Sequence, residues 1–171
     1  MTGPRWLDER EHRAWRDFHV MRRRLESVVN RQLLHDAGLS AADYELLVPL
    51  SEAPGQRLRA RDLGREVDWE KSRLSHHIGR MERRGLIERR ECPTDARGAF
   101  IHLTEKGRLA VETVAPGHVE TVRRYFIDLL TPAELDTLTS IADRVIRRVA
   151  EGTAPEDRSG GDNRAVTQPP R

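Results

Sequence analysis

Cysteine, lysine and long apolar runs are scarce in this chain. Its 171 residues include one cysteine, Cys92, and two lysines among 30 basic residues. A single thiol excludes an intramolecular disulfide framework and a multi-cysteine zinc site, and such usage is typical of a reducing cytosol. Since no apolar run is long enough for a signal peptide or a membrane-spanning helix, we expect a cytoplasmic protein with no membrane segment, metal site or cofactor.

Common catalytic motifs are also missing. The sequence has no Walker phosphate-binding loop and no nucleophile elbow. The tripeptide His118-Val119-Glu120 matches half of a zinc-deaminase signature, but the Pro-Cys-x-x-Cys half that completes the ligand set is absent. The sequence therefore does not predict an enzyme.

Charge is abundant and unevenly placed. Charged residues make up 34% of the chain and the mean hydropathy is −0.70, which favours a modest core with an extended helical arm. Residues 57–97 hold twelve basic and eight acidic residues, a balance of +4, so the rest of the chain carries −2 of the total +2. The placement of the basic residues, more than their number, indicates a nucleic-acid partner.

Two stretches outside this basic segment predict long amphipathic helices. Apolar side chains recur at helical spacing in residues 8–35, and Gly38 is expected to end that helix. Residues 131–151 repeat the pattern after a Thr-Pro-Ala-Glu start signal. A small central module can cover only part of these apolar stripes, so we expect the rest to be covered by an identical subunit in a homodimer.

Further caps lie between the two stretches. Ser40 and Asp43 predict a helix start, and the Pro-Gly pair at 54–55 predicts the end of that helix. Thr104 is expected to cap a helix that extends to about residue 130 and is interrupted or bent at Pro116.

Residues 58–103 are the most informative part of the sequence. They predict a helix over 59–66, a tight turn, a second helix from a cap at Asp68 to about Arg84, and two short strands joined by a basic loop over 92–98. A helix-turn-helix followed by such a hairpin is a winged helix, a module that reads duplex DNA. The expected fold is therefore mainly α with a small β-hairpin wing.

The second helix of this unit has two faces. Leu74, Ile78 and Met81 turn one face inward, His77 is expected to pack half-buried beside them, and Trp69 is expected to brace the start of the helix. For each polar residue taken alone, an ordinary position on a solvent-exposed helix face explains it as well as DNA contact does. The candidates for contact are Arg73 and His76 to base edges, and Lys71, Ser72, Ser75 and Arg80 to phosphates.

The hairpin loop places Asp95 and Arg97 near its tip. A long cation projected from a hairpin can enter the narrow minor groove, where the negative potential is greatest. We expect Arg97 to do so, with Asp95 orienting the arginine or the loop.

These elements divide the chain into four parts. We expect an N-terminal dimerisation helix, a winged helix-turn-helix domain, C-terminal dimerisation helices and a disordered tail, over residues 1–38, 39–104, 105–151 and 152–171.

The ordered series of motifs resembles the multiple antibiotic resistance regulator (MarR) family of bacterial winged-helix transcription factors over most of residues 10–150. The resemblance rests on Trp-Glu-Lys-Ser-Arg-Leu-Ser-His at 69–76, the stretch at 81–90, Asp-Ala-Arg-Gly at 95–98 and Leu-Thr-Glu-Lys-Gly at 103–107. It implies a two-fold dimer on a near-palindromic operator, with the wing arginine in the minor groove. Many members have a second basic residue where this chain has Ala96, which leaves Arg97 as the single wing cation.

The same resemblance implies a small-molecule effector. Family members often release DNA when a phenolic or other anionic ligand fills a cleft between the dimer helices and the DNA-binding lobe. By resemblance alone, the conceivable ligand contacts in this chain are Trp15, His19, Arg23 and Tyr44.

The sequence thus predicts a sequence-specific regulator that binds double-stranded DNA. A repressor of neighbouring genes is favoured over an activator, because a dimer that covers promoter DNA blocks polymerase without a dedicated activation surface. Two alternatives stay open. The winged helix can be a protein-interaction module, or Cys92, whose pKa Arg89 and Arg90 could lower, can make the regulator redox-responsive.

Overall fold

The computed structural model describes residues 3–92 and 95–153, with the side chains of residues 91–98 outside this description. The chain divides into two compact units, residues 1–129 and residues 130–171. The mainly α fold with a small sheet is confirmed. The expected disorder of the tail lies outside the described residues, except that residues 152 and 153 belong to the last helix.

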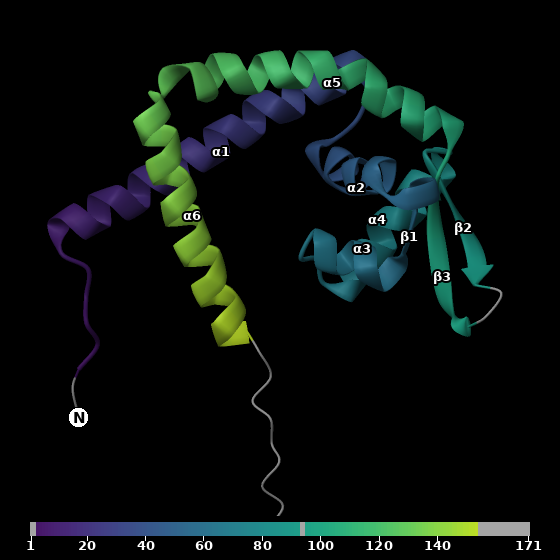
Figure 1. Ribbon diagram of the computed structural model, residues 1–171, viewed down its shortest axis with the longest axis horizontal. Coiled ribbons are helices and arrows are strands. Elements are labelled where there is room, and N and C mark those ends of the chain that lie inside the picture. Colours follow the sequence, from purple (N-terminus) through teal and green to yellow (C-terminus); the bar gives the residue numbers. More distant parts are fainter. Residues whose placement is uncertain (1–2, 93–94, 154–171) are drawn as a thin grey trace, which may run out of the picture. The chain divides into compact units, whose positions relative to one another are not determined.

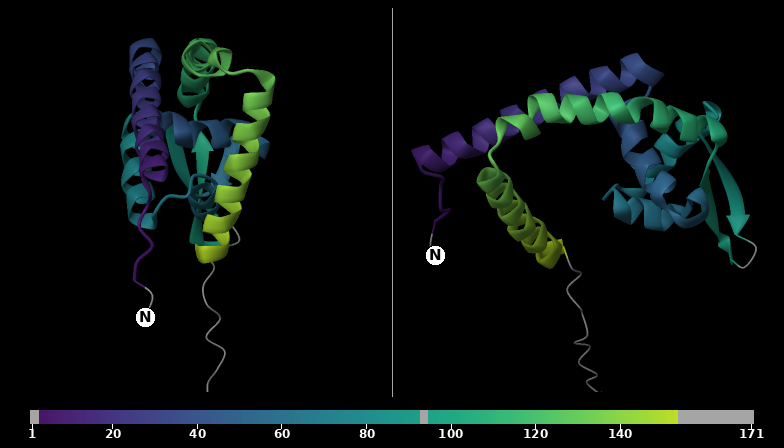
Figure 2. Two further views of the ribbon diagram at one scale, coloured as in Figure 1. Left: turned by 90° about the vertical axis from the view of Figure 1, so that its left-hand side faces the viewer. Right: turned by 45° about the horizontal axis from the view of Figure 1, so that its top comes forward.

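Two long helices run side by side in the first unit (Figure 1 and Figure 2). Helix α1 covers Glu9–Ala37 and helix α5 covers Glu105–Tyr125. As expected, Gly38 ends α1 in the left-handed conformation, at φ 64°, and its N–H donates to the carbonyl of Leu34 at 3.0 Å. The Thr104 hydroxyl accepts from the Gly107 N–H at the start of α5, which confirms that cap.

Helix α5 is shorter than expected and is not interrupted at Pro116. It ends at Tyr125, and a short 3-10 helix, η2 (Ile127–Leu129), follows. Packing against α1 supports α5 around the proline, since Gln32 Nε2 donates to the carbonyl of Val114 at 3.3 Å. A Cβ on Gly117 would stand 2.6 Å from Asp36 Oδ2, so glycine permits this close approach of the two helices.

The winged-helix lobe lies between these two helices in the sequence. It contains α2 (Ala41–Glu52), η1 (Pro54–Gln56), β1 (Arg57–Arg59), α3 (Ala60–Glu66), α4 (Lys71–Arg83), β2 (Ile87–Cys92) and β3 (Asp95–Leu103). The strands form an antiparallel sheet in the order β1-β3-β2, with Arg57 opposite His102 and Ile87 opposite Leu103. The predicted hairpin is confirmed, but the loop expected over 92–98 is too long, because Cys92 belongs to β2 and β3 already begins at Asp95. Strand β1 was not predicted, because three residues are too few to show an alternating pattern.

The start of α4 differs from expectation. Asp68 does not cap this helix; its φ of 51° places it in the left-handed region, within the turn after α3. The helix begins at Lys71 with Glu70 as the N-cap, and no side chain caps it. The expected cap at Ser40 is present at α2, where Ser40 and Asp43 form a reciprocal capping box.

Leucine dominates the core of the first unit. Side chains from α1, α2, α3 and α5 meet those of α4 and the sheet, and burial of this apolar surface supplies the main stabilisation. The fully buried members are Leu33, Leu39, Leu46, Leu47, Leu50, Leu63, Ile78, Met81, Ile87, Ile101 and Val114. A Cβ on Gly107 would stand 2.1 Å from the Leu86 carbonyl oxygen, so the start of α5 lies directly on the backbone before β2.

The second unit contains helix α6, Pro132–Thr153. As expected, Thr131 caps it: the Thr131 N–H donates to Glu134 Oε2 at 2.7 Å, and the Glu134 N–H donates to the Thr131 hydroxyl at 3.3 Å. Its apolar stripe is exposed within the single chain, through Leu138, Ile141, Val145, Ile146 and Val149, at 37% to 65%. Across residues 3–92 and 95–153, no helix has both the length and the apolarity needed to cross a bilayer.

Candidate nucleic-acid interface

Helix α4 presents the polar face that the sequence predicts. Leu74, Ile78 and Met81 are buried against the core, so the opposite face points to solvent. Every candidate for DNA contact on this helix is exposed, namely Lys71, Ser72, Arg73, Ser75, His76 and Arg80. The geometry brings these six residues to one surface, and their contacts with DNA stay a prediction.

Arg73 is held against an aromatic ring. Its guanidinium carbon lies 3.8 Å from the centroid of the Trp69 ring, and Trp69 is 8% exposed. The Trp69 indole N–H donates to Glu45 Oε1 on α2 at 3.1 Å. Trp69 therefore braces the start of α4, as expected, and also restricts Arg73 to an orientation that leaves guanidinium N–H groups free to donate to a base edge.

Arg80 is positioned by a buried histidine. One guanidinium nitrogen of Arg80 lies 2.6 Å from His77 Nδ1, and His77 Nε2 lies 2.9 Å from Asp43 Oδ1 on α2. Since arginine only donates, Nδ1 must accept and Nε2 must carry the hydrogen that is donated to Asp43. Burial lowers the pKa of His77 by more than the Asp43 carboxylate raises it, which agrees with the neutral ring. His77 was expected to be half-buried, but it is buried and hydrogen-bonded on both nitrogens.

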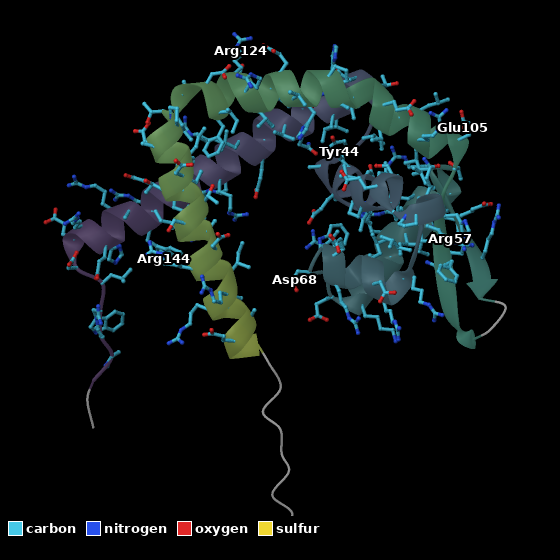
Figure 3. All side chains as sticks on the ribbon, in the orientation of Figure 1. Tyr44, Arg57, Asp68, Glu105, Arg124 and Arg144 are labelled. Atoms are coloured by element: carbon cyan, nitrogen blue, oxygen red, sulfur yellow. The ribbon has the colours of Figure 1, made fainter. Side chains whose placement is uncertain are left out.

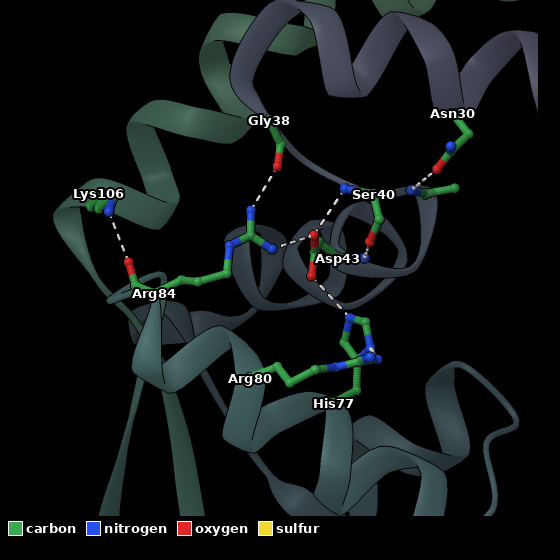
Figure 4. Close-up of polar contacts among 9 residues, drawn as sticks. Asn30, Gly38, Ser40, Asp43, His77, Arg80, Arg84 and Lys106 are labelled. Atoms are coloured by element: carbon green, nitrogen blue, oxygen red, sulfur yellow. Dashed lines mark hydrogen bonds and ion pairs between the residues drawn. The ribbon is translucent and has the colours of Figure 1, made fainter.

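Asp43 joins α4 to the end of α1 (Figure 4). Its Oδ2 accepts from Arg84 Nη1 at 2.7 Å, and Arg84 Nη2 donates to the carbonyl of Gly38 at 2.6 Å. Lys106 on α5 donates to the carbonyl of Arg84 at 2.8 Å. Burial raises the pKa of Asp43, but the hydrogen bonds from Arg84 and Ser40 lower it by more, so the carboxylate stays ionised. This polar network fixes α4 relative to the long helices.

A hollow of about 590 Å³ lies between α3, α4 and the sheet. We call it the cationic hollow, since four basic residues line it and none of its lining side chains within the described part of the chain is acidic. Its base is apolar, and Arg89 Nη2 donates to the carbonyl of Ser75 at 3.3 Å, which ties β2 to α4. The basic residues are Arg59, Arg61, Lys71 and Arg89. Sequence reasoning did not assign Arg59, Arg61 or Arg89 to the interface, although all three lie in the basic segment that it identified.

For the candidate wing residues Cys92, Asp95 and Arg97 the structure describes the backbone only. Asp95 and Arg97 lie on β3, and Cys92 pairs with Asp95 at the end of the hairpin. Their side chains are outside the described part of the structure, so the minor-groove role of Arg97, the orienting role of Asp95 and the redox role of Cys92 stay predictions.

The four candidate ligand contacts do not come together. Tyr44 lines a groove of about 590 Å³ formed by α1, α2, α5 and the turn after α3. Trp15 and His19 contact each other on α1, with ring centroids 4.3 Å apart, and Arg23 is exposed further along that helix; none of these three lines the groove. Figure 3 shows Tyr44 and Asp68 on one side of the lobe and Arg57 on the other.

Four acidic residues and one histidine in this groove were not predicted. They are Glu45, Glu52, Glu66, Asp68 and His118. They come from four separate elements, and no spacing in the sequence indicates that they converge. We call this site the acidic groove.

Comparison with known proteins identifies the chain. Residues 37–98 match a model described as MarR family. The structure of Sco3205 from Streptomyces coelicolor, a MarR family regulator solved in complex with DNA, is 41% identical, covers 90% of this chain and 94% of that one, and has a TM-score of 0.81. AbsC from the same organism, also a MarR family transcriptional regulator, is 42% identical over 86% of this chain and 99% of its own, with a TM-score of 0.82. The HTH-type transcriptional regulator YkoM of Bacillus subtilis is 26% identical over 133 residues, which is 77% of this chain and 84% of that protein. The fold, the exposed polar face of α4 and these matches show that the chain belongs to the MarR family of transcriptional regulators.

Proposed function

We propose that this regulator is a homodimeric repressor that binds a near-palindromic operator beside its own gene and releases it when a small molecule binds. The observation that carries the DNA-binding part is the exposed polar face of α4 directly beside the cationic hollow. With α4 in the major groove, the hollow faces the phosphate backbone that runs between α4 and the wing. The DNA complex of the similar regulator Sco3205 supports this proposal.

Exposed apolar stripes support the homodimer. Trp15, Phe18 and Met21 on α1 are 57%, 48% and 41% exposed, and the stripe of α6 is exposed along its length. Stripes of this size on a soluble monomer mark an association surface, and a two-fold dimer would set two α4 helices about 34–36 Å apart, one turn of DNA.

The test of dimerisation is the mass in solution. Light scattering is expected to give the mass of two chains for the wild type, and a mixed or monomeric mass for a variant that combines Ile141→Glu with Val145→Glu. The variant should keep the circular dichroism of the wild type. A wild type that scatters as one chain at all concentrations would overturn the dimer.

DNA binding is tested by fluorescence anisotropy with the DNA upstream of the gene at two salt concentrations. The affinity is expected to exceed that for a scrambled sequence and to fall with salt at a log-log slope of about −0.9 per phosphate neutralised. Lys71→Ala should lower that slope by about one, because Lys71 is an exposed cation at the hollow. Weak binding that does not depend on sequence would instead favour a protein-interaction module.

Repression is tested by transcription in a deletion strain. Higher transcription of the neighbouring genes would establish repression, and lower transcription would refute it.

A further inference from the structure

The acidic groove is a broad depression that is widely open to solvent. It measures about 590 Å³, so its volume is sufficient for a drug-sized molecule lying along its floor. Its floor is apolar and comes from three regions, the C-terminal part of α1, one face of α2 and the residue after α3. These floor residues are Val29, Leu33, Val48, Pro49 and Val67.

Carboxylates surround this apolar floor. Glu45, Glu52, Glu66 and Asp68 are all exposed at the edge of the groove, and among the described residues that line it none is lysine or arginine. Glu45 accepts a hydrogen bond from Trp69, whereas Glu52, Glu66 and Asp68 have no ion pair or side-chain hydrogen bond with any described residue. Three carboxylates are therefore free to meet a positively charged group.

The two ring side chains in the groove bring no positive charge. Burial, and then the nearby Glu52 carboxylate, raise the pKa of Tyr44, so its phenol stays protonated. Burial lowers the pKa of His118, so its imidazole stays neutral at neutral pH. The two ring centroids lie 4.8 Å apart, and the buried His118 Nδ1 has no hydrogen-bond partner among the described residues. The groove thus offers an aromatic wall, an unused polar nitrogen and a rim of negative charge.

We infer that the acidic groove binds an amphipathic organic cation, a molecule with an apolar body and a quaternary or protonated amine. The apolar body would lie on the floor, and the cationic centre would face Tyr44 and the free carboxylates. An anionic phenol, the ligand class that the family resemblance implies, would meet four like charges and no counter-charge.

One contact links this groove to the reading face of α4. Glu45 lies at the rim and also accepts the Trp69 N–H, and Arg73 stacks on the Trp69 ring. A bound cation that attracts the Glu45 carboxylate would take the acceptor from Trp69 and loosen the surface that orients Arg73. This effect on DNA rests on the proposed function, whereas ligand binding itself does not.

Binding is tested on the full chain without DNA, by isothermal titration with tetraphenylphosphonium and with tetraphenylborate, ions of similar size and shape but opposite charge. We expect the phosphonium to bind, and a variant that combines Glu52→Gln with Glu66→Gln to weaken it by about tenfold or more. Glu120→Gln is the matched control, because Glu120 is exposed on α5 away from the groove. Equal binding of both ions, or full phosphonium affinity in the double variant, would overturn the inference. Thermal melts without ligand establish that each variant is folded.

The link to DNA is tested separately, by adding the phosphonium to the preformed operator complex. Release of the operator is expected for the wild type. The phosphonium concentration that releases half of the complex should be about tenfold higher for Glu45→Gln, with each protein at a concentration matched to its own operator affinity. Phosphonium binding without release would refute the Glu45 link and leave the ligand class standing. Failure to bind the operator at all would refute the proposed function instead.

Discussion

The cationic hollow and the acidic groove have the same volume and opposite charge. Each measures about 590 Å³ and each has an apolar base, but four basic residues line the first and four acidic residues line the second. Trp69 lines the hollow, while its indole N–H donates to Glu45 at the groove. A total charge of +2 therefore conceals two strongly charged sites that meet at one tryptophan.

The scaffold that holds both sites depends on one glycine, and its replacement should have the largest effect. Gly107→Ala would place a Cβ 2.1 Å from the Leu86 carbonyl oxygen and 2.8 Å from the Leu103 side chain, and the backbone cannot yield cheaply. We expect chemical denaturation to show a loss of about 3 kcal/mol or more in the free energy of unfolding.

Gly79→Ala is the control for that variant. A Cβ on Gly79, in the middle of α4, would meet nothing closer than an Arg83 nitrogen at 3.9 Å. It should raise the free energy of unfolding by about 0.5–1 kcal/mol through helix propensity. Equal effects of the two alanines would contradict the close approach of α5 to the backbone before β2.

The next largest effect is a loss of operator affinity when Arg73, on the exposed polar face of α4, is replaced. Arg73→Ala should cost about 1–3 kcal/mol of specific operator affinity, measured by anisotropy, while the fold and the dimer persist. Arg73→Lys keeps the charge but loses the planar guanidinium that stacks on Trp69, so it should lose specificity and keep non-specific affinity. Wild-type operator affinity in the alanine variant would remove Arg73 from the reading face.

Acid should weaken the polar network between the two sites. The folded-state pKa of His77 lies below its ordinary value, so the unfolded chain takes up a proton first. The contribution of His77 is therefore complete above about pH 6.5 and decreases as the pH falls below that value toward the folded-state pKa. Denaturation midpoints measured between about pH 7 and pH 5 should fall with pH.

His77→Gln should make that decrease smaller, because the amide can still donate to Asp43 but does not titrate in this range. Part of the slope should remain, since burial lowers the pKa of His118 and of His102 in the same direction. An unchanged slope in the variant would show that His77 does not carry the effect.

The smallest expected effect comes from removing the hydrogen bond by which Trp69, at the cationic hollow, contacts Glu45 at the acidic groove. Trp69→Phe keeps an aromatic ring under Arg73 but removes the N–H that donates to Glu45. Loss of this partly buried hydrogen bond should lower the free energy of unfolding by about 1 kcal/mol. Phosphonium should still bind to this variant while its effect on operator affinity decreases, and undiminished release would contradict the Trp69 link.

Local signals in the sequence were sufficient for much of the fold. The caps at Ser40, Thr104 and Thr131 and the stop at Gly38 are each set by contacts within a few residues, which is why the spacing alone predicts them. The inward face of α4 follows from its helical period in the same way. Asp68 shows the limit, since a good capping residue instead adopts a left-handed turn that the packing of α3 and α4 imposes.

The sites depend on long-range contacts that the sequence does not reveal. Asp43 was predicted as a helix-start residue, but its bond to His77 joins positions 34 residues apart. The rim of the acidic groove likewise combines two residues of α2 with the end of α3 and a turn, and the apolar floor that gives those carboxylates a role comes partly from α1. Composition predicted the basic charge of the segment that contains α4 and the cationic hollow, and gave no indication of the acidic groove.

Asp43 also ties the first turn of α2 to the rest of the lobe. Its carboxylate completes the first turn of α2, accepts from His77 on α4 and holds Arg84, which reaches the carbonyl at the end of α1. That first turn cannot fray alone, because unwinding it would break the bond to His77 on α4 and free Arg84, which reaches the end of α1. Its amide protons should therefore exchange with deuterated solvent only when α2 and α4 separate, as one cooperative unit with a single protection factor.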